Sequence, residues 1–465
     1  MNKLRANCLN FMELLAQNIA LISPTMTAAL IVPLMFGTLG SVGWLGYALG
    51  TVLLLFVAFS LNQFAKRTTM VGSMYNYAST GLGFTGGALC GWCLVWSYLF
   101  IGLAGTTGFT IFASKLLEAV HIPLPPVVLF ATCLGISFIM GYKDIRISTL
   151  VMLGLEAFSC VFILLLCVIV LGHHHFAVDP TQFSFKGVSV LSLGMGCVVA
   201  IFSLVGFESS TAFGEEAVNP LKTIPRSIIW SLILTGAFFM LTCYVEVLGT
   251  AGYKDTLDKI DAPLNVLATM YHVPYLWPFL SAGAMFSFFA LASSCMNAGA
   301  RVMFAMGRHE FFPESTSAAH MKHGTPHVAL ATMASVMFSV VTVGYFVLVH
   351  NGMAVLDEFN FAGTMGAFGF TGAYVLITLA APGFLKKRGE LNGKDIALCA
   401  VTMLLLLIPI VGSVYPVPAP PVNAFPYVFA AYLFIGYVRI MAMQHQKPSR
   451  VEEIGMEIKK LAQPA

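Results

Sequence analysis

Apolar positions along this chain form long, nearly uninterrupted runs, unlike the alternating pattern of strands or the one-sided pattern of surface helices. Twelve runs are long enough to cross about 30 Å of hydrocarbon as helices. They lie near residues 14–36, 42–64, 86–112, 126–142, 148–171, 189–213, 228–249, 276–304, 327–349, 357–381, 395–415 and 423–443. The pattern predicts an all-α integral membrane protein with twelve transmembrane helices.

Composition supports this interpretation, because a chain of 465 residues with only 10% charged residues cannot cover a globule with polar surface. An average soluble domain carries about 25% charged residues. No two of the ten cysteines lie in an evident outer loop, so we expect no disulfide framework. We also expect no cleaved signal peptide, because polar residues interrupt the first run: Glu13, Gln17 and Asn18.

The distribution of positive charge predicts the orientation of the chain. With the N-terminus inside, 20 of the 24 Lys and Arg residues fall in inside segments, and only four fall outside: Lys115, Lys186, Lys254 and Lys259. Inside loops of membrane proteins are enriched in Lys and Arg, so we expect a protein of the cytoplasmic membrane with both termini in the cytoplasm. We expect three histidines in a solvated outer loop, with a metal or pH role as the alternative: His173, His174 and His175.

Two of the runs are interrupted at their centres by residues that disfavour a continuous helix. The first run contains Pro24, which lacks a backbone donor and clashes with the carbonyl one turn earlier. The sixth run contains Gly206 and Glu208, followed by three hydroxyl residues. Irregular backbone at membrane depth is tolerated only where it lines a cavity or is buried in protein.

The two interruptions lie five runs apart. Because five is odd, a second copy of a five-helix unit would enter the membrane upside down. Paired interruptions at matching positions of two such repeats indicate the binding site of a transporter. The alternative is that Pro24 only kinks its helix and that Gly206 only serves helix packing.

Three groups of residues resemble motifs of the amino acid–polyamine–organocation permeases. The groups are 206–208 (GFE) with 215–220 (EEAVNP) and 224–226 (IPR); 72–77 (GSMYNY) with 91–92 (GW); and 300–308 (ARVMFAMGR) with 312–313 (FP). The resemblance covers nearly the whole chain. It implies a five-plus-five inverted repeat with two further helices, divided into a first repeat over 1–187, a second over 188–385, two helices over 386–446 and a cytoplasmic tail over 447–465.

The resemblance also implies a site for a substrate that carries an ammonium group and usually a carboxylate. In the family, backbone amides at the first break hold the carboxylate and backbone carbonyls at the second hold the ammonium, in agreement with the partial charges at helix ends. The first set corresponds here to Ser23, Pro24, Thr25, Met26 and Thr27, where Ser-Pro-Thr replaces the usual glycine-rich bend. The second set corresponds to Phe202 and Val205, and the break continues through Gly206, Phe207 and Glu208.

A carboxyl group in the fifth run, Glu156, lies at membrane depth, where a charge costs at least about 2.5 kcal/mol. Some proton-coupled relatives carry a lysine in the corresponding place, so Glu156 is a candidate for proton coupling. Ser293 and Ser294 on the eighth run are expected to face the same region, close to the break at Pro24. The alternative for Glu156 is a buried, protonated carboxyl bonded to a neighbouring helix.

Glu208 is a candidate substrate-binding group at the second break. Its alternative role is a helix-start carboxylate that accepts hydrogen bonds from the amides of Ser210 or Thr211. We expect the carboxylates at 215 and 216 to pair with inside basic residues, such as Lys222 or Arg226.

These features together predict a secondary active transporter that moves a small amino acid or amine by alternating access, coupled to protons or working by exchange. No G-x-x-x-x-G-K-[ST] loop occurs, so we expect no drive by ATP. A membrane-embedded enzyme would need a convergent His, Asp or Ser cluster, and none is evident, so we expect no enzymatic activity and no cofactor. One alternative is a non-transporting sensor of the same fold. Another is a polyamine-specific permease, in which Glu208 could serve as the second acidic partner of a diamine.

Overall fold

The computed structural model describes residues 6–68, 74–143, 145–260 and 262–462, so the start of the 72–77 motif lies outside the described residues. All regular elements within the described residues are helices. The main ones are α1 (Phe11–Ile22), α3 (Val32–Leu39), α4 (Gly43–Ala65), α5 (Met74–Ala119), α6 (Pro126–Lys143), α7 (Ile145–His173), α8 (Val190–Leu204), α9 (Pro220–Gly249), α10 (Pro263–Met270), α11 (Trp277–Arg308), α12 (His327–His350), α13 (Val355–Arg388), α14 (Gly393–Gly412), α15 (Phe425–Gln446) and α16 (Pro448–Ala462).

Ten helical segments among the described residues are long and apolar enough to cross a membrane, which agrees with a multi-span helical protein. Ten is fewer than the twelve predicted runs for two local reasons. The first two runs lie in one segment, Phe11–Ala65, whose chain bends at Gly40 with a φ of +61°. The sixth run gives only α8, whose 15 residues are fewer than the roughly 20 a span needs, because the helix ends at the predicted break.

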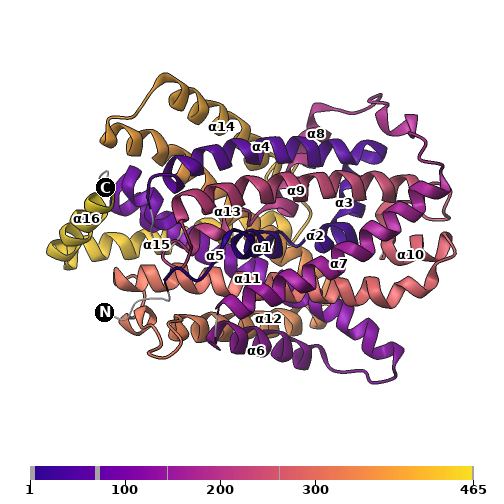
Figure 1. Ribbon diagram of the computed structural model, residues 1–465, viewed down its shortest axis with the longest axis horizontal. Helices are drawn as coiled ribbons and strands as arrows, with labels where there is room; N and C mark the ends of the chain where they lie inside the picture. The colour runs from indigo at the N-terminus through magenta and orange to yellow at the C-terminus, as the bar shows by residue number, and fades with distance from the viewer. Residues whose placement is uncertain (1–5, 69–73, 144, 261, 463–465) are drawn as a thin grey trace.

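The helices lie side by side along the long axis of the molecule, with α1 near the centre (Figure 1). α1 packs against α7, α9 and α11, so the first broken helix is enclosed by protein. The most apolar windows of α12, α14 and α15 are only 17% buried. These three helices therefore present most of their apolar surface outward, as expected for helices that contact lipid.

Both ends of the described chain lie at the same end of the helix bundle, which we call the terminus end. The amide of Leu9 donates to the carbonyl of Glu216 at 3.0 Å. The neighbouring Glu215 pairs with Arg308 at 3.4 Å, and the guanidinium of Arg450 on α16 donates to the Arg308 carbonyl at 3.3 Å. The opposite end of the bundle is called the far end.

The segment expected to be a tail is a helix, α16, and it is only partly exposed. Ile454 and Ile458 are 0% and 5% exposed, and α16 packs on α5. The Nζ of Lys447 lies 2.5 Å from Glu310, just beyond α11. The apolar face of α16 therefore packs against the terminus end of the bundle. All ten cysteines are free.

Candidate functional site

The first apolar run breaks at Ser23, whose φ of +53° lies in the left-handed region and ends α1. Pro24 then opens the one-turn helix α2 (Pro24–Met26), a position where its missing amide is not needed. A π-helical stretch, η1 (Thr27–Ile31), connects this turn to α3. The Ser-Pro-Thr sequence therefore gives a genuine interruption and not a simple kink.

The second break follows α8. Val205 is extended, with ψ of 147°, and Gly206 has a φ of +102°, a conformation that side chains other than glycine rarely adopt. The chain then resumes as a short 3₁₀ helix, η4 (Ser209–Ala212). A Cβ added at Gly206 would lie 1.8 Å from Cδ2 of Leu21, so glycine is also required for the close approach of α1.

The two interrupted segments lie against each other, although they belong to the first and the sixth apolar runs. The Oδ1 of Asn18 on α1 accepts hydrogen bonds from the amide of Ser210 at 2.7 Å and the hydroxyl of Ser209 at 3.0 Å. The same Ser209 hydroxyl donates to the carbonyl of Gln17 at 3.3 Å. A side chain of the first broken helix thus caps the helix that follows the second break.

The carboxyl group of Glu208 is fully buried at the second break. Its Oε2 accepts hydrogen bonds from the amide of Gly206 at 3.2 Å and from the hydroxyl of Tyr374 on α13 at 2.8 Å. The alternative role as a helix-start carboxylate is wrong, because the amides of Ser210 and Thr211 bond elsewhere: to the Asn18 side chain and, at 2.9 Å, to the Glu208 carbonyl. Glu208 instead joins the break to α13.

Glu156 lies beside the first break, with a side chain that is 2% exposed. The hydroxyl of Ser287 on α11 donates to its Oε1 at 2.9 Å and is itself hydrogen-bonded to the hydroxyl of Ser23 at 2.9 Å. The Thr25 hydroxyl, at the same break, bonds to the hydroxyl of Ser159 on α7. Glu156 therefore connects α7, α11 and the first break.

Ser293 and Ser294 do not take the places expected for them. Ser293 bonds to Ser137 on α6 at 2.6 Å, and Ser294 bonds to the side chain of Gln17 at 2.5 Å. Helical geometry explains the difference: Ser287 precedes Ser294 by two turns on the same face, whereas Ser293 is rotated by about 100° toward α6. The hydroxyl that meets Glu156 is therefore that of Ser287.

Three of the amides proposed to hold a substrate carboxylate already donate to backbone carbonyls. The amide of Ser23 donates to Ile19 at 2.9 Å, the amide of Met26 donates to Ser23 at 2.9 Å, and the amide of Thr27 donates to Pro24. A substrate carboxylate that used any of these amides would have to displace the bond it makes.

A cavity of about 400 Å³ opens near the breaks, on the far-end side. This volume lies in the range of small-ligand sites. Of the predicted site residues, Phe202 lines the cavity, whereas Phe207 packs on Tyr374 with ring centroids 5.4 Å apart. The lining residues are Ala29, Leu30, Pro33, Leu34, Phe202, Asp258, Ile260, Leu356, Asn360 and Thr364.

The terminus end is closed beneath the breaks by a buried ion pair. The carboxylate of Glu216 accepts from Arg301 Nε at 2.5 Å and Nη2 at 2.7 Å, and both side chains are 0% exposed. The expected partners, Lys222 and Arg226, were wrong for both carboxylates, since the neighbouring Glu215 pairs with Arg308. Both arginines belong to α11, about 90 positions after the carboxylates in the sequence, so local spacing could not identify them.

The three adjacent histidines lie at the end of α7 and just beyond it, where the rings of His173 and His174 both pack on Tyr271, 5.2 and 6.0 Å from its ring centroid. His174 bonds to the hydroxyl of Tyr271 at 2.7 Å, while His173 and His175 are exposed. Within the described residues, no group of three His, Cys, Asp or Glu side chains is placed to hold a metal ion.

Sequence reasoning missed three residues that organise this region. Ser287 and Tyr374 gave no local signal, because a hydroxyl within a helix is common. Asn18 does give a local signal, because it is a polar side chain within an apolar run, but the sequence does not show which segment it contacts. Its contacts with Ser209 and Ser210 depend on a segment nearly 200 positions away.

The fold is that of a multi-span helical transporter. It matches the crystal structure of a manganese transporter from Eremococcus coleocola with a TM-score of 0.60, over 97% of this chain and 95% of that one. Identity is 11%, so this likeness concerns the fold alone. A family model described as amino acid permease matches residues 14–443, and the chain belongs to that family.

Several related proteins are named as permeases or importers. The chain is 24% identical to the branched-chain amino acid permease BcaP of Bacillus subtilis over 75% of this chain and 74% of that protein. It is 27% identical to BcaP of Lactococcus lactis over 74% of each chain. It is 24% identical to the low-affinity putrescine importer PlaP of Escherichia coli K12, over 62% of this chain and 65% of that one.

Proposed function

We propose that this permease moves a small amino acid or amine by alternating access, with the substrate held between the two facing breaks. The observation that carries the proposal is the asymmetry around them. A cavity that includes Phe202 opens on the far-end side, while the buried pair of Glu216 and Arg301 closes the terminus end. Alternating access requires a second state in which this pair separates and the far end closes.

The proposed architecture has twelve crossings in a five-plus-five inverted repeat. The first repeat would run from α1 to α7 and the second from α8 to α13, with α14 and α15 as the two further helices. The breaks at Ser23 and Gly206 then interrupt the first span of each repeat, at corresponding positions. The shared position of the two chain ends supports an even number of crossings, and the charge bias supports placing the terminus end in the cytoplasm.

The proposed substrate carries at least one ammonium group. Glu156 and Glu208 place two buried carboxyl groups next to the breaks, where a cation would offset their negative charge. A branched-chain amino acid fits the relatives named BcaP, and the apolar part of the cavity lining, which includes Leu30 and Leu356, suits its side chain. A diamine fits the putrescine importer and would need no amides for a carboxylate.

The proposed coupling is to protons, through Glu156. A carboxyl group bonded to Ser287 and facing the first break can carry a proton in one access state and lose it in the other. The bound proton would then shift the population between the two states. Exchange of substrates without net proton movement is the second mode that the same site allows.

A thermal-shift screen of purified protein against amino acids and amines would identify the substrate class, because a ligand that binds the folded state raises its unfolding midpoint. Uptake of the best ligand into proteoliposomes, with and without an imposed pH gradient, would then test transport. We expect accumulation when the outside is acidic and no requirement for sodium. A ligand that stabilises the protein but never enters the vesicles would favour the sensor.

A further inference from the structure

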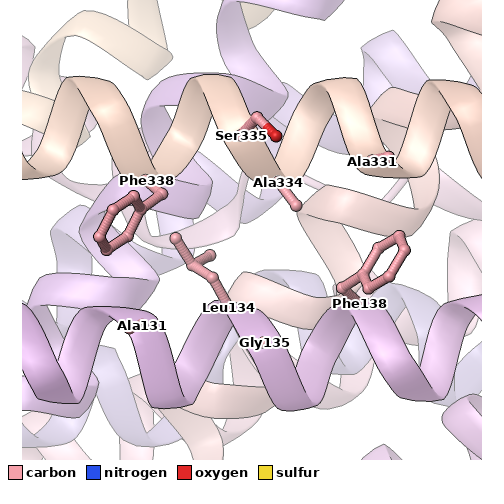
Figure 2. Close-up of a pocket in the computed structure, with 8 residues that line it drawn as sticks. All are labelled: Ala131, Leu134, Gly135, Phe138, Ala331, Ala334, Ser335 and Phe338. Atoms are coloured by element: carbon pink, nitrogen blue, oxygen red, sulfur yellow. The ribbon is translucent and has the colours of Figure 1, made fainter.

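A second cavity, outside the transport site, lies between α6 and α12. It has a volume of about 330 Å³. Figure 2 shows the two helices running alongside each other, with the rings of Phe138 and Phe338 at opposite ends of the gap and Leu134 and Ala334 between them. The remaining lining residues are Ala131, Gly135, Ala331 and Ser335. We call this the α6–α12 groove.

The α6–α12 groove faces the bilayer and not the transport pathway. Only 33% of the most apolar window of α6 and 17% of that of α12 are buried in the protein. Neighbouring side chains are apolar and exposed, among them Ile136 at 46%, Ile139 at 52% and Val336 at 39%. The groove is thus a recess in a hydrocarbon-facing surface, with a shape that suits an acyl chain.

The walls of the groove continue to a polar cluster at the terminus end. Residues 131, 135, 138 and 142 share one face of α6 at helical spacing, so Tyr142 extends the wall that contains Phe138. The two rings lie 5.8 Å apart. Beyond them, the Tyr142 ring lies 5.1 Å from His320 and 5.5 Å from His323. His327, at the start of α12, lies 5.3 Å from His320.

Hydrogen bonding in this cluster leaves donors available. The amides of Lys322 and His323 donate to Nδ1 of His320, each at 3.2 Å, so neutral His320 carries its hydrogen on Nε2. That nitrogen lies 3.0 Å from the Tyr142 hydroxyl, whose own hydrogen can therefore point to another acceptor. The buried Nδ1 of His327 has no partner within the described structure. The Tyr142 hydroxyl hydrogen and the His327 Nδ1 can therefore both bond to a group placed in this cluster.

The cluster is also positively charged. Lys143 ends α6 and is exposed, as is Lys322. No carboxylate in the described part of the chain forms an ion pair with either lysine. Partial burial, together with the nearby His323, His327 and Lys322, lowers the pKa of His320. An anion placed here would be attracted by the two lysines.

We propose that the α6–α12 groove binds one anionic phospholipid, with an acyl chain between Phe138 and Phe338 and the phosphate at Tyr142, the histidine cluster and Lys143 and Lys322. Basic pockets between membrane helices are the sites at which anionic headgroups bind. A second copy of the chain fits less well. A symmetric dimer through this face would bring each basic cluster close to its own copy, and like charges would oppose the contact.

Native mass spectrometry of the purified protein tests the proposal. Phosphatidylglycerol and phosphatidylcholine with identical acyl chains are titrated separately, and we expect one saturable adduct that forms preferentially with phosphatidylglycerol. The double substitution Lys143→Gln and Lys322→Gln should weaken this adduct about thirtyfold, given the usual contribution of a lysine near an anionic headgroup. The matched control is Lys386→Gln with Lys394→Gln, two exposed lysines on other helices, which should bind as the parent does.

The acyl-chain part of the site is tested by Ala334→Phe, which fills the groove, against Val336→Phe, which adds the same ring on an exposed face of α12. Only the first should reduce the adduct. The lysine variants keep the test valid if Ala334→Phe folds poorly. Equal binding of the two lipids, equal binding by the two lysine pairs, or a dimer that Ala334→Phe dissociates would overturn the proposal.

Discussion

Glu216 and Arg301 form a two-pronged ion pair, 2.5 and 2.7 Å long, in which both side chains are completely buried. The pair joins the segment after the second break to α11, and the guanidinium also stacks over the ring of Phe213, 4.3 Å from its centroid. The backbone carbonyl of Glu216 holds the amides of Cys8 and Leu9. Glu216 thus connects the segment after the second break to α11 through its side chain and to the N-terminal segment through its carbonyl.

Removing the arginine should therefore be costly. We expect Arg301→Met to destabilise the protein by about 3–5 kcal/mol, because the Glu216 carboxylate is left buried without its counterion. Thermal unfolding in detergent measures the effect. The control, Arg308→Met, breaks the longer and partly exposed pair with Glu215 and should cost less than about 1 kcal/mol. Similar midpoints for the two variants would contradict the importance of burial here.

Gly206 is expected to tolerate no side chain. Gly206→Ala should lower both the unfolding midpoint and substrate uptake, since the new methyl group meets Leu21 and the positive φ alone costs about 1–3 kcal/mol. Leu21→Ala alone should destabilise, because Leu21 is buried, but Gly206→Ala should cost less in the Leu21→Ala background than in the parent, since the collision is absent there. Gly154→Ala on α7, where a Cβ meets nothing within 4 Å, serves as the control and should be neutral. An equal cost of Gly206→Ala in both backgrounds would mean that the contact with Leu21 is unimportant.

Glu156→Gln should separate binding from coupling. The amide keeps a hydrogen bond to Ser287 but cannot exchange a proton, so we expect loss of accumulation driven by a pH gradient while substrate exchange continues. Flux into proteoliposomes under both conditions measures this. Glu358→Gln, a buried carboxyl group near Gly344 of α12, is the matched control and should accumulate substrate normally. Full accumulation by Glu156→Gln would assign the carboxyl a structural role.

Docking of α16 should weaken in acid. Burial, with Arg450 and Arg308 nearby, lowers the pKa of His309 from 6.5 to about 4, and its ring bonds to the Tyr75 hydroxyl. A depressed pKa stabilises the docked state fully above 6.5, and that contribution is lost as the pH falls from 6.5 towards 4. Amide exchange is intrinsically slower in acid, so the measure is the protection factor, the observed exchange rate relative to the intrinsic rate at the same pH. The protection factors of the α16 amides should fall as the pH is lowered across this window. In His309→Gln this fall should disappear; a fall that persists would exclude His309 as its source.

The sequence predicted the helical, membrane-spanning character and both breaks because these depend on local chemistry. Pro24 cannot continue a helix, and Gly206 is placed where φ is positive. The polar partners of the breaks could not be predicted in the same way. Tyr374 reaches Glu208 from α13, and Ser287 reaches Glu156 from α11, so both contacts depend on how distant helices pack.

The sequence also could not predict which serine of α11 contacts the first break. Ser294 lies on the same face of α11 as Ser287, but two turns nearer the terminus end, where it meets Gln17. Since α1 and α11 run in opposite directions, only a known packing register can say which of the two hydroxyls meets the first break. The ion partners of Glu215 and Glu216 were missed for the same reason.

Counterflow in proteoliposomes tests the central claim most directly, because it requires transport through the protein but no imposed ion gradient. Vesicles are loaded with the unlabelled compound that the thermal-shift screen identifies, then diluted into a trace of the labelled compound. We predict transient accumulation of label by the parent and by Glu156→Gln, and none by Gly206→Ala. Stable binding of the compound without any counterflow by the parent would contradict the account and identify a sensor.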